Sequence, residues 1–197
     1  MANEYADLGT LKAQLSLEDT DDTRDVLLQQ ALTAASRSID AATGRRFWLD
    51  GTPVQRVYRP RGRTVCEPDG ELLLVDDIGS STGLTVETGS SATWTAVTGW
   101  ESMPDNALAD GRPVTALLRQ GGWGSVLGRV RVTARFGWPA VPDEIVQATL
   151  IQANRLFKRK DSPEGVTGSA EWGVVRLSRR DPDVWNLIEP YVLPGFG

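Results

Sequence analysis

Two neighbouring carboxylates, Asp76 and Asp77, form the pair of residues that most resembles a metal-dependent active site. They follow residues 71–75, an apolar segment typical of a β-strand. Adjacent strand residues point to opposite faces of a sheet, so the two carboxylates are not expected to converge on one ion. A metal-dependent hydrolase using Asp76 and Asp77 is therefore an alternative hypothesis, and an acidic turn at a strand end is favoured.

A second acidic group lies near the N-terminus and contains Glu18, Asp19, Asp21 and Asp22. Closely spaced carboxylates can chelate a divalent cation, but this segment lacks the glycine and terminal glutamate of a calcium-binding loop. A solvated acidic start to the following helix is the favoured interpretation. The sequence predicts no metal site and no cofactor.

The chain contains no histidine and a single cysteine, Cys66. These counts exclude Ser-His-Asp and Cys-His catalysis, and zinc sites built from histidine or from four cysteines. An intrachain disulfide is also impossible, which suits folding in a reducing cytoplasm. The sequence has neither a secretory-signal pattern nor an apolar run of about 18 residues, so no membrane partner is expected.

The densest basic run of the chain contains Arg56, Arg59, Arg61 and Arg63, with Tyr58 between them. Three interpretations remain open: a loop that contacts phosphates, a solvated hairpin, or an interface with acidic surface on a neighbouring subunit. Under the third interpretation, the candidate subunit-interface residues are Arg56, Arg59 and Arg61.

Charge is distributed unevenly along the chain. Residues 1–50 carry 9 acidic and 5 basic side chains, residues 51–137 carry 9 of each, and residues 138–197 carry 8 and 7, which gives the net charge of −5. A dedicated duplex-binding protein needs a concentrated positive face. Sequence-specific DNA binding is therefore not expected.

The two ends of the chain are predicted to be helical. In the N-terminal part, Asp22 can cap a long helix that ends at Gly44, and its apolar residues recur at helical spacing: Leu28, Leu32, Ala35, Ile39 and Ala42. In the C-terminal part, Pro142 suits the first position of a helix. The apolar row of that helix is Val146, Leu150, Ala153 and Phe157. Asp181 is predicted to cap one more helix, with Pro182 at its first position.

The middle of the chain is rich in turn residues and has no helical periodicity. Short strands are predicted in PVQRVYRP, ELLLV, GLTVE, ATWTAV, PVTALL and VLGRVRVTARF, with breaks at residues 79–81, 89–91 and 121–122. Several short strands at this spacing are typical of a small antiparallel sheet, sandwich or barrel. Trp94, Trp100 and Trp123 are either core residues of that sheet or exposed contacts.

These patterns predict an α+β protein with a helical bundle and an inserted antiparallel sheet or sandwich. The expected parts are residues 1–50 as the N-terminal part of the bundle, residues 51–137 as a β subdomain, and residues 138–197 as the C-terminal helices with an extended arm and tail.

Four segments of the sequence are similar to one known family: LQQALTAASRSIDAATGRRF, FGWPAVPDEIVQA, RLFKRKDSPEGV and VRLSRRDPDVWNLIEPY. They resemble the head-tail connector, or adaptor, proteins of tailed bacteriophages. The resemblance covers roughly residues 5–48 and 129–192, and the strand-rich middle lies outside it. Many small connectors of this family are nearly all helical, so the inserted sheet is a departure.

The resemblance implies a structural virion protein and not an enzyme. Such proteins form a ring, commonly of twelve subunits, that docks on the portal protein and offers its other face to a stopper or tail-completion protein. Double-stranded DNA would pass through the lumen without sequence-specific binding, and the protein would be found in the virion neck and, during assembly, in the host cytoplasm. Another neck or tail-completion role is an alternative.

In this family the C-terminal helix and tail tend to engage the portal. Carried onto this chain, the resemblance gives these candidate contact residues: Arg176, Arg179, Arg180, Trp185, Tyr191 and Phe196. Tryptophan and arginine are favoured anchor residues at protein interfaces.

Overall fold

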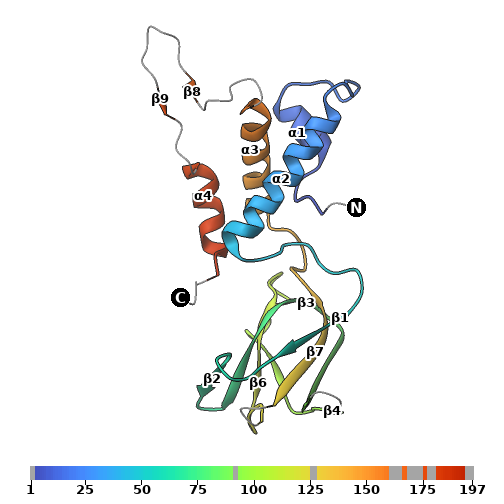
Figure 1. Ribbon diagram of the computed structural model, residues 1–197, viewed down its shortest axis with the longest axis vertical. Helices are drawn as coiled ribbons and strands as arrows, with labels where there is room; N and C mark the ends of the chain where they lie inside the picture. Colours follow the sequence, from blue (N-terminus) through green and yellow to red (C-terminus); the bar gives the residue numbers. More distant parts are fainter. Residues whose placement is uncertain are drawn as a thin grey trace. The chain divides into compact units, whose positions relative to one another are not determined.

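The computed structural model describes residues 3–90, 93–124, 128–159, 166–167, 175–176 and 181–193, with only the backbone of 166–167 and 175–176. The chain divides into two compact units. One consists of residues 1–45 and 141–197 and contains the helices; the other consists of residues 46–140 and contains the large sheet (Figure 1). The predicted α+β class is confirmed.

The helical unit contains four described α-helices and a 3₁₀ turn. They are α1 (Leu8–Gln14), α2 (Asp25–Thr43), α3 (Asp143–Lys158), α4 (Pro182–Ile188) and η2 (Glu189–Tyr191). Helix α3 packs against both α2 and α4, and α1 packs against α2 and α3 (Figure 1). Between α3 and α4 the chain forms two short strands, β8 (Val166–Thr167) and β9 (Val175–Arg176), which pair with each other.

Capping residues explain three of the helix boundaries. The Asp7 carboxylate accepts a 2.8 Å hydrogen bond from the Thr10 amide at the start of α1, and these Thr10 contacts lower the pKa of Asp7. Gly44 ends α2 with a left-handed φ of 69°, as the sequence predicts. Asp181 caps α4 by accepting from the backbone amides of the first turn, with Pro182 at its first position, also as predicted.

Two of the predicted helix starts are wrong by a few residues. The N-cap of α2 is Arg24 and not Asp22, because the backbone forms a turn in which the Asp25 amide donates to the Asp22 carbonyl. Pro142 is the N-cap of α3 and not its first residue. Its extended backbone, with ψ of 146°, lies outside the helix.

The helical core forms where the two predicted apolar rows meet. Leu28, Leu32 and Ala35 of α2 are fully buried together with Ala153 of α3 and Leu11 of α1. Burying a leucine side chain contributes about 1.5–3 kcal/mol, so these contacts outweigh the propensities of the individual helices. The helical period in the sequence therefore identified most of the packing face, but Ala42 is exposed, Val146 is only partly buried, and Ile145 and Thr149 of the neighbouring row of α3 are fully buried.

Seven of the described strands form one antiparallel sheet. They are β1 (Val54–Tyr58), β2 (Thr64–Glu67), β3 (Gly70–Ser90), β4 (Thr93–Ala96), β5 (Glu101–Met103), β6 (Val114–Arg119) and β7 (Arg129–Phe136). The main strand order is β1-β7-β3-β6-β5, with β2 and β4 also paired to β3. Strands β2 and β5 are not anticipated from the sequence, because both are short and mostly exposed.

Strand β3 organises the whole sheet. Glu71 pairs with both β2 and β6, and Glu87 pairs with both β4 and β7, so β3 has two partners along each edge. At Ile78 the strand pairs with β6 on one edge and β7 on the other. The register shifts between residues 78 and 85, where a β-bulge bends a strand.

The sequence prediction of two separate strands here is wrong. Residues 79–81 do not end a strand but lie at the bend inside β3. Gly79 is required there because a Cβ atom would lie 2.7 Å from the backbone oxygen of Gly137. Gly79, which the sequence analysis interpreted as a break between strands, therefore marks a close approach between two backbone segments and not a chain reversal.

The core of the strand-rich unit contains the inward residues of β7 and β3. Val130, Val132, Ala134 and Phe136 of β7 alternate with half-buried or exposed residues, which confirms the predicted period of two. Ile78 of β3 lies in the same core.

The three tryptophans differ in environment. Trp123 is buried, and its indole donates to the backbone oxygens of Glu71 and Leu117 at 2.8 and 3.2 Å. Trp100 is partly buried and packs against the core. Trp94 lies in β4 and is half-buried. Only Trp123 is a full core residue.

We expect Gly137→Ala to destabilise the protein by roughly 2–4 kcal/mol. Gly137 has a φ of 115°, and an added Cβ would overlap the carbonyl oxygen of Trp48. Gly62→Ala is the matched control, because Gly62 has a φ of 78° with open space around it and should lose only about 1 kcal/mol. Denaturant unfolding measures both; equal losses would contradict the overlap.

Candidate functional site

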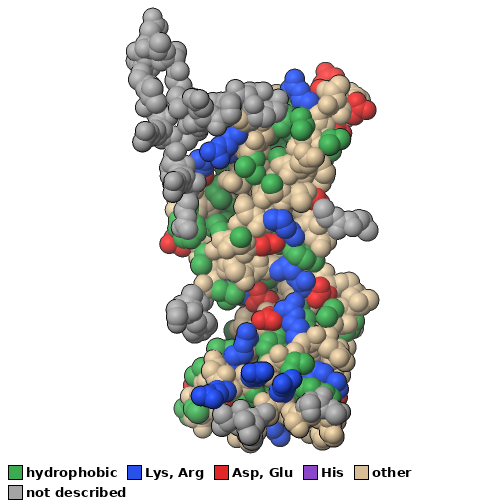
Figure 2. All heavy atoms as spheres, in the orientation of Figure 1, with side chains coloured by type: hydrophobic (Ala, Val, Ile, Leu, Met, Phe, Trp, Pro, Cys, Tyr) green, Lys and Arg blue, Asp and Glu red, His purple; other side chains and the backbone are tan. Residues whose placement is uncertain are grey.

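The predicted basic run lies on β1 and on the turn that joins β1 to β2. We call residues 59–63 the arginine loop. The amide of Arg63 donates to the Pro60 carbonyl at 2.9 Å, which closes the loop as a tight turn. Arg59 and Arg61 are exposed and form no ion pair with any residue that the structure describes. Figure 2 shows arginine side chains, drawn in blue, on the face of the strand-rich unit that is in view.

Arg56 is held differently from the loop arginines. Its Nη1 lies 2.6 Å from Asp76 Oδ2, and its guanidinium lies 4.0 Å from the centre of the Phe136 ring. Arg56 of β1 pairs with Val132 of β7, and Val132 pairs in turn with Val86 of β3. Val86 follows Asp76 by ten residues in strand β3, so the sheet register alone does not place Arg56 opposite Asp76. The ion pair therefore connects β1 to the first half of the bent strand.

Tyr58 completes this polar cluster. Its hydroxyl donates to Asp76 Oδ2 at 3.1 Å, and Arg63 stacks on its ring at 5.3 Å. Burial raises the pKa of the Tyr58 hydroxyl well above its ordinary value of 10, and the nearby Asp76 carboxylate adds to the rise. Together with Arg56 and the loop arginines these residues line a hollow of about 530 Å³, whose walls carry four arginines and one carboxylate.

Another outward arginine, Arg131, is already neutralised. Its Nε and Nη2 donate to the two carboxylate oxygens of Glu87 at 2.6 and 2.7 Å, and its guanidinium stacks over Trp94 at 4.5 Å. These hydrogen bonds lower the pKa of Glu87. Arg131 therefore adds no free positive charge beside the arginine loop.

The two carboxylates singled out in the sequence have separate partners. Asp76 binds Arg56 and Tyr58, whereas Asp77 Oδ2 accepts a 3.1 Å hydrogen bond from the indole of Trp138. Across the described ranges, no three acidic or cysteine side chains lie close enough together to hold a metal ion. Asp76 and Asp77 therefore do not converge on one site, as the alternative hydrolase hypothesis would require.

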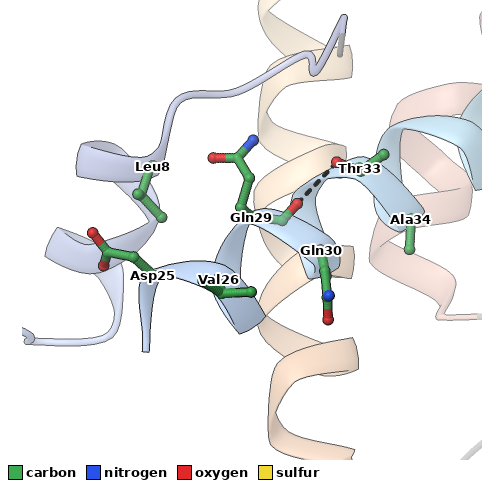
Figure 3. A pocket seen from close by; sticks show the side chains of 7 residues that line it. All are labelled: Leu8, Asp25, Val26, Gln29, Gln30, Thr33 and Ala34. Carbon is green, nitrogen blue, oxygen red and sulfur yellow. Dashed lines mark hydrogen bonds between the residues drawn. The ribbon is translucent and has the colours of Figure 1, made fainter. Parts of the chain in front are cut away.

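Helices α1 and α2 border an apolar groove that the sequence analysis missed (Figure 3). Its volume is about 630 Å³, and it is lined by Leu8, Asp25, Val26, Gln29, Gln30, Thr33 and Ala34. Val26 is 71% exposed and the adjacent Leu27 is 47% exposed. The sequence offered one indication of this groove: Val26 and Leu27 are apolar but fall outside the buried row of α2, which begins at Leu28.

The loop before α2 carries most of the acidic N-terminal group. Glu18, Asp19 and Asp22 are exposed and form no ion pair with a described residue. Asp21 accepts from the amide and hydroxyl of Thr23, which lowers its pKa. The preference for a solvated helix start is consistent with these contacts.

Lys12 anchors this loop from inside. It is 4% exposed, its ammonium lies 2.6 Å from Asp25 Oδ1, and it donates to the Asp19 carbonyl at 3.1 Å. The acidic loop and the first turn of α2 are therefore fixed against α1.

The candidate C-terminal contact residues are only partly described. Trp185 lies half-buried in α4, and the Tyr191 hydroxyl donates to Glu144 at 2.9 Å. The Tyr191 carbonyl accepts from Arg45 at 2.8 Å. The backbone of Arg176 lies in β9, while its side chain lies outside the described residues, as do the other three candidates, Arg179, Arg180 and Phe196.

The described part of the chain after α4 ends at Leu193, so most of the predicted extended tail lies outside the described residues. Residues 189–191 form a 3₁₀ turn, and the Leu193 amide donates to the Thr43 carbonyl at the end of α2. Among the described helices, none combines the length and apolar composition needed to cross a bilayer.

Comparison with known proteins gives a structural likeness. No family model matches the chain, and no curated protein matches its sequence. A chain from the neck of an empty GTA particle, determined with C6 symmetry, matches with a TM-score of 0.59 at 19% identity. A chain from the virion of a native gene transfer agent (GTA) particle matches with a TM-score of 0.55 at 19% identity. Both matches cover 98% of this chain and 92% of the other, so the whole fold, sheet included, is shared.

We expect Tyr58→Phe to weaken the pH dependence of stability above pH 10. The unfolded chain loses the tyrosine proton near pH 10 while the folded chain keeps it, so the free energy of unfolding falls with rising pH, by at most about 1.4 kcal/mol per pH unit. Below pH 10 this contribution is fully present. The Phe variant should lack this slope, whereas Tyr191→Phe should keep it. Denaturant unfolding from pH 8 to about 11 checks this; identical slopes would contradict the assignment.

Proposed function

We propose that this chain is a structural component of the neck of a tailed, phage-like particle, where it forms a ring between the head and the tail. The observation that carries the proposal is the fold shared over 98% of the chain with a protein of a GTA neck. The resemblance of both helical segments to head-tail connectors supports the same role. The proposed function requires no bond-breaking chemistry, and the separate engagement of Asp76 and Asp77 is consistent with this.

Within the neck, we assign the chain the adaptor position, docked on the portal and facing a stopper or tail-completion protein. Duplex DNA would pass through its lumen. The net charge of −5 suits a channel along which DNA slides without sticking. The ring is proposed to match the portal with twelve subunits.

The C-terminal elements are the proposed portal contacts. Val184 and Ile188 are the buried residues of α4, which leaves Trp185 at the border of the exposed side. Arg176, Arg179 and Arg180 precede this helix in the sequence, and Tyr191 and Phe196 follow it. Arginines and aromatic residues close together in the sequence suit a partner with an acidic surface and apolar pockets.

Electron microscopy of the purified chain mixed with its cognate portal protein tests the position in the neck. We expect a ring of this protein seated on the portal, with density for both compact units in every subunit. A ring that binds only purified tail components would place the protein at the tail side of the neck. Absence from the necks of intact particles would overturn the proposal.

We expect Arg179→Glu combined with Arg180→Glu to weaken portal binding by about tenfold or more, because charge reversal replaces attraction with repulsion. The matched control is Arg112→Glu with Arg129→Glu, which makes the same change in net charge at exposed arginines of the other unit. Binding is measured by surface plasmon resonance at two salt concentrations. Unchanged affinity of the first variant would remove the arm from the interface.

A further inference from the structure

We propose that the apolar groove between α1 and α2 binds the arginine loop of a second copy of this chain, and that this contact joins neighbouring subunits in the ring. This inference rests on the proposed function and identifies the two surfaces that the ring would use. It is built from two exposed patches, one on each compact unit.

The groove supplies the first patch. Leu8, Val26 and Ala34 give it an apolar lining (Figure 3), and Leu27, the residue after Val26 in α2, is also exposed. An exposed valine and leucine on adjacent positions of a helix otherwise lose the stabilisation that burial would give, and contiguous exposed apolar surface marks interaction sites.

The loop that leads into α2, at the start of the groove-lining helix, carries net negative charge, because its four carboxylates (Glu18, Asp19, Asp21 and Asp22) outnumber the exposed Arg24. Glu18, Asp19 and Asp22 lie in the loop that leads into the first turn of α2, directly before Val26 in the chain. Lys12 is buried and paired with Asp25, so it does not neutralise the exposed carboxylates. Figure 2 shows acidic side chains at the α1 end of this unit.

The arginine loop supplies a complementary patch. Arg59, Arg61 and Arg63 are exposed, and only Arg63 has a carboxylate nearby, with 3.8 Å between its Nη1 and Asp76 Oδ1. The loop is flanked by two exposed apolar side chains, Val57 at 50% and Val65 at 42%. Like the groove, it combines charge with apolar surface, but the sign of the charge is opposite.

The pattern of charges favours a head-to-tail contact. A contact that placed each patch against its own copy would bring acid against acid or base against base, which is repulsive, whereas a groove–loop contact pairs opposite charges. A contact between two different patches on each subunit generates a ring when the rotation closes. The acidic groove and the basic loop satisfy that requirement within one sequence.

Charge reversal on each patch tests the proposal. The first variant carries Arg59→Glu and Arg61→Glu, and the second carries Asp19→Arg and Asp22→Arg. Each should lower self-association by about tenfold or more, since both patches of one subunit then carry the same sign. A one-to-one mixture of the two variants should regain assembly, because the reversed patches are complementary when the variants alternate. Sedimentation velocity and negative-stain microscopy measure the assemblies.

Two further variants separate this contact from general effects of charge or folding. Arg112→Glu with Arg129→Glu repeats the charge change of the first variant elsewhere and should assemble as the unmodified chain does. Val26→Ser should weaken assembly without changing net charge, because it removes apolar surface from the groove. Circular dichroism confirms that each variant is folded.

The outcomes distinguish this inference from the proposed function. If the unmodified chain enters particle necks and the charge-reversed variants assemble equally well, the groove–loop contact is wrong and the neck function stands. If the variants assemble normally but lose binding to the portal or a tail component, the groove binds another protein and the inference is overturned. If the unmodified chain is absent from necks, the proposed function fails whatever its self-association.

Discussion

The bend in strand β3 is the constraint on which the strand-rich unit depends. Four strands pair directly with β3, and the register shift after Ile78 directs its two halves to different partners. The Arg56–Asp76 ion pair connects β1 to the first half of β3, although β1 is aligned through β7 with the second half. Both side chains are about one-third or more exposed, so the pair itself contributes at most about 1 kcal/mol. Core burial stabilises the bend, and the pairing of β1 with β7 positions the start of the basic run.

The same geometry separates arginines that are engaged within the chain from those that are available. Arg56 and Arg131 each bind a carboxylate and stack on an aromatic ring, and they stabilise the sheet from its surface. Arg59 and Arg61 lie beyond the end of β1 with no such partner among the described residues. Net charge alone would not reveal this distribution, because residues 51–137 contain equal numbers of acidic and basic side chains. An adhesive surface depends on which charges remain unpaired after folding.

In the helical unit, burial rather than helix propensity sets the arrangement. Short helices such as α1 and α4 are marginal alone, and each is fixed by a capping aspartate at its start and by packing against a longer helix. Contacts from Arg45 and Thr43 to residues after α4 hold the C-terminal elements against the end of α2. Of the proposed portal contacts, Trp185 and Tyr191 therefore lie on elements that described contacts hold against the rest of the helical unit.

The sequence by itself determined the α+β class, most of the two apolar helix rows, the glycine end of α2, the aspartate cap of α4 and the alternation of β7. Each of these depends on local chemistry or on a short period, which neighbouring residues specify. Only the tertiary structure decided that residues 79–81 bend one strand instead of separating two, because that depends on a backbone distant in sequence approaching Gly79. It also decided that Asp76 and Asp77 bind different partners, and that Val26 and Leu27 stay exposed beside a groove. Pairing and exposure arise from long-range packing, which no local pattern encodes.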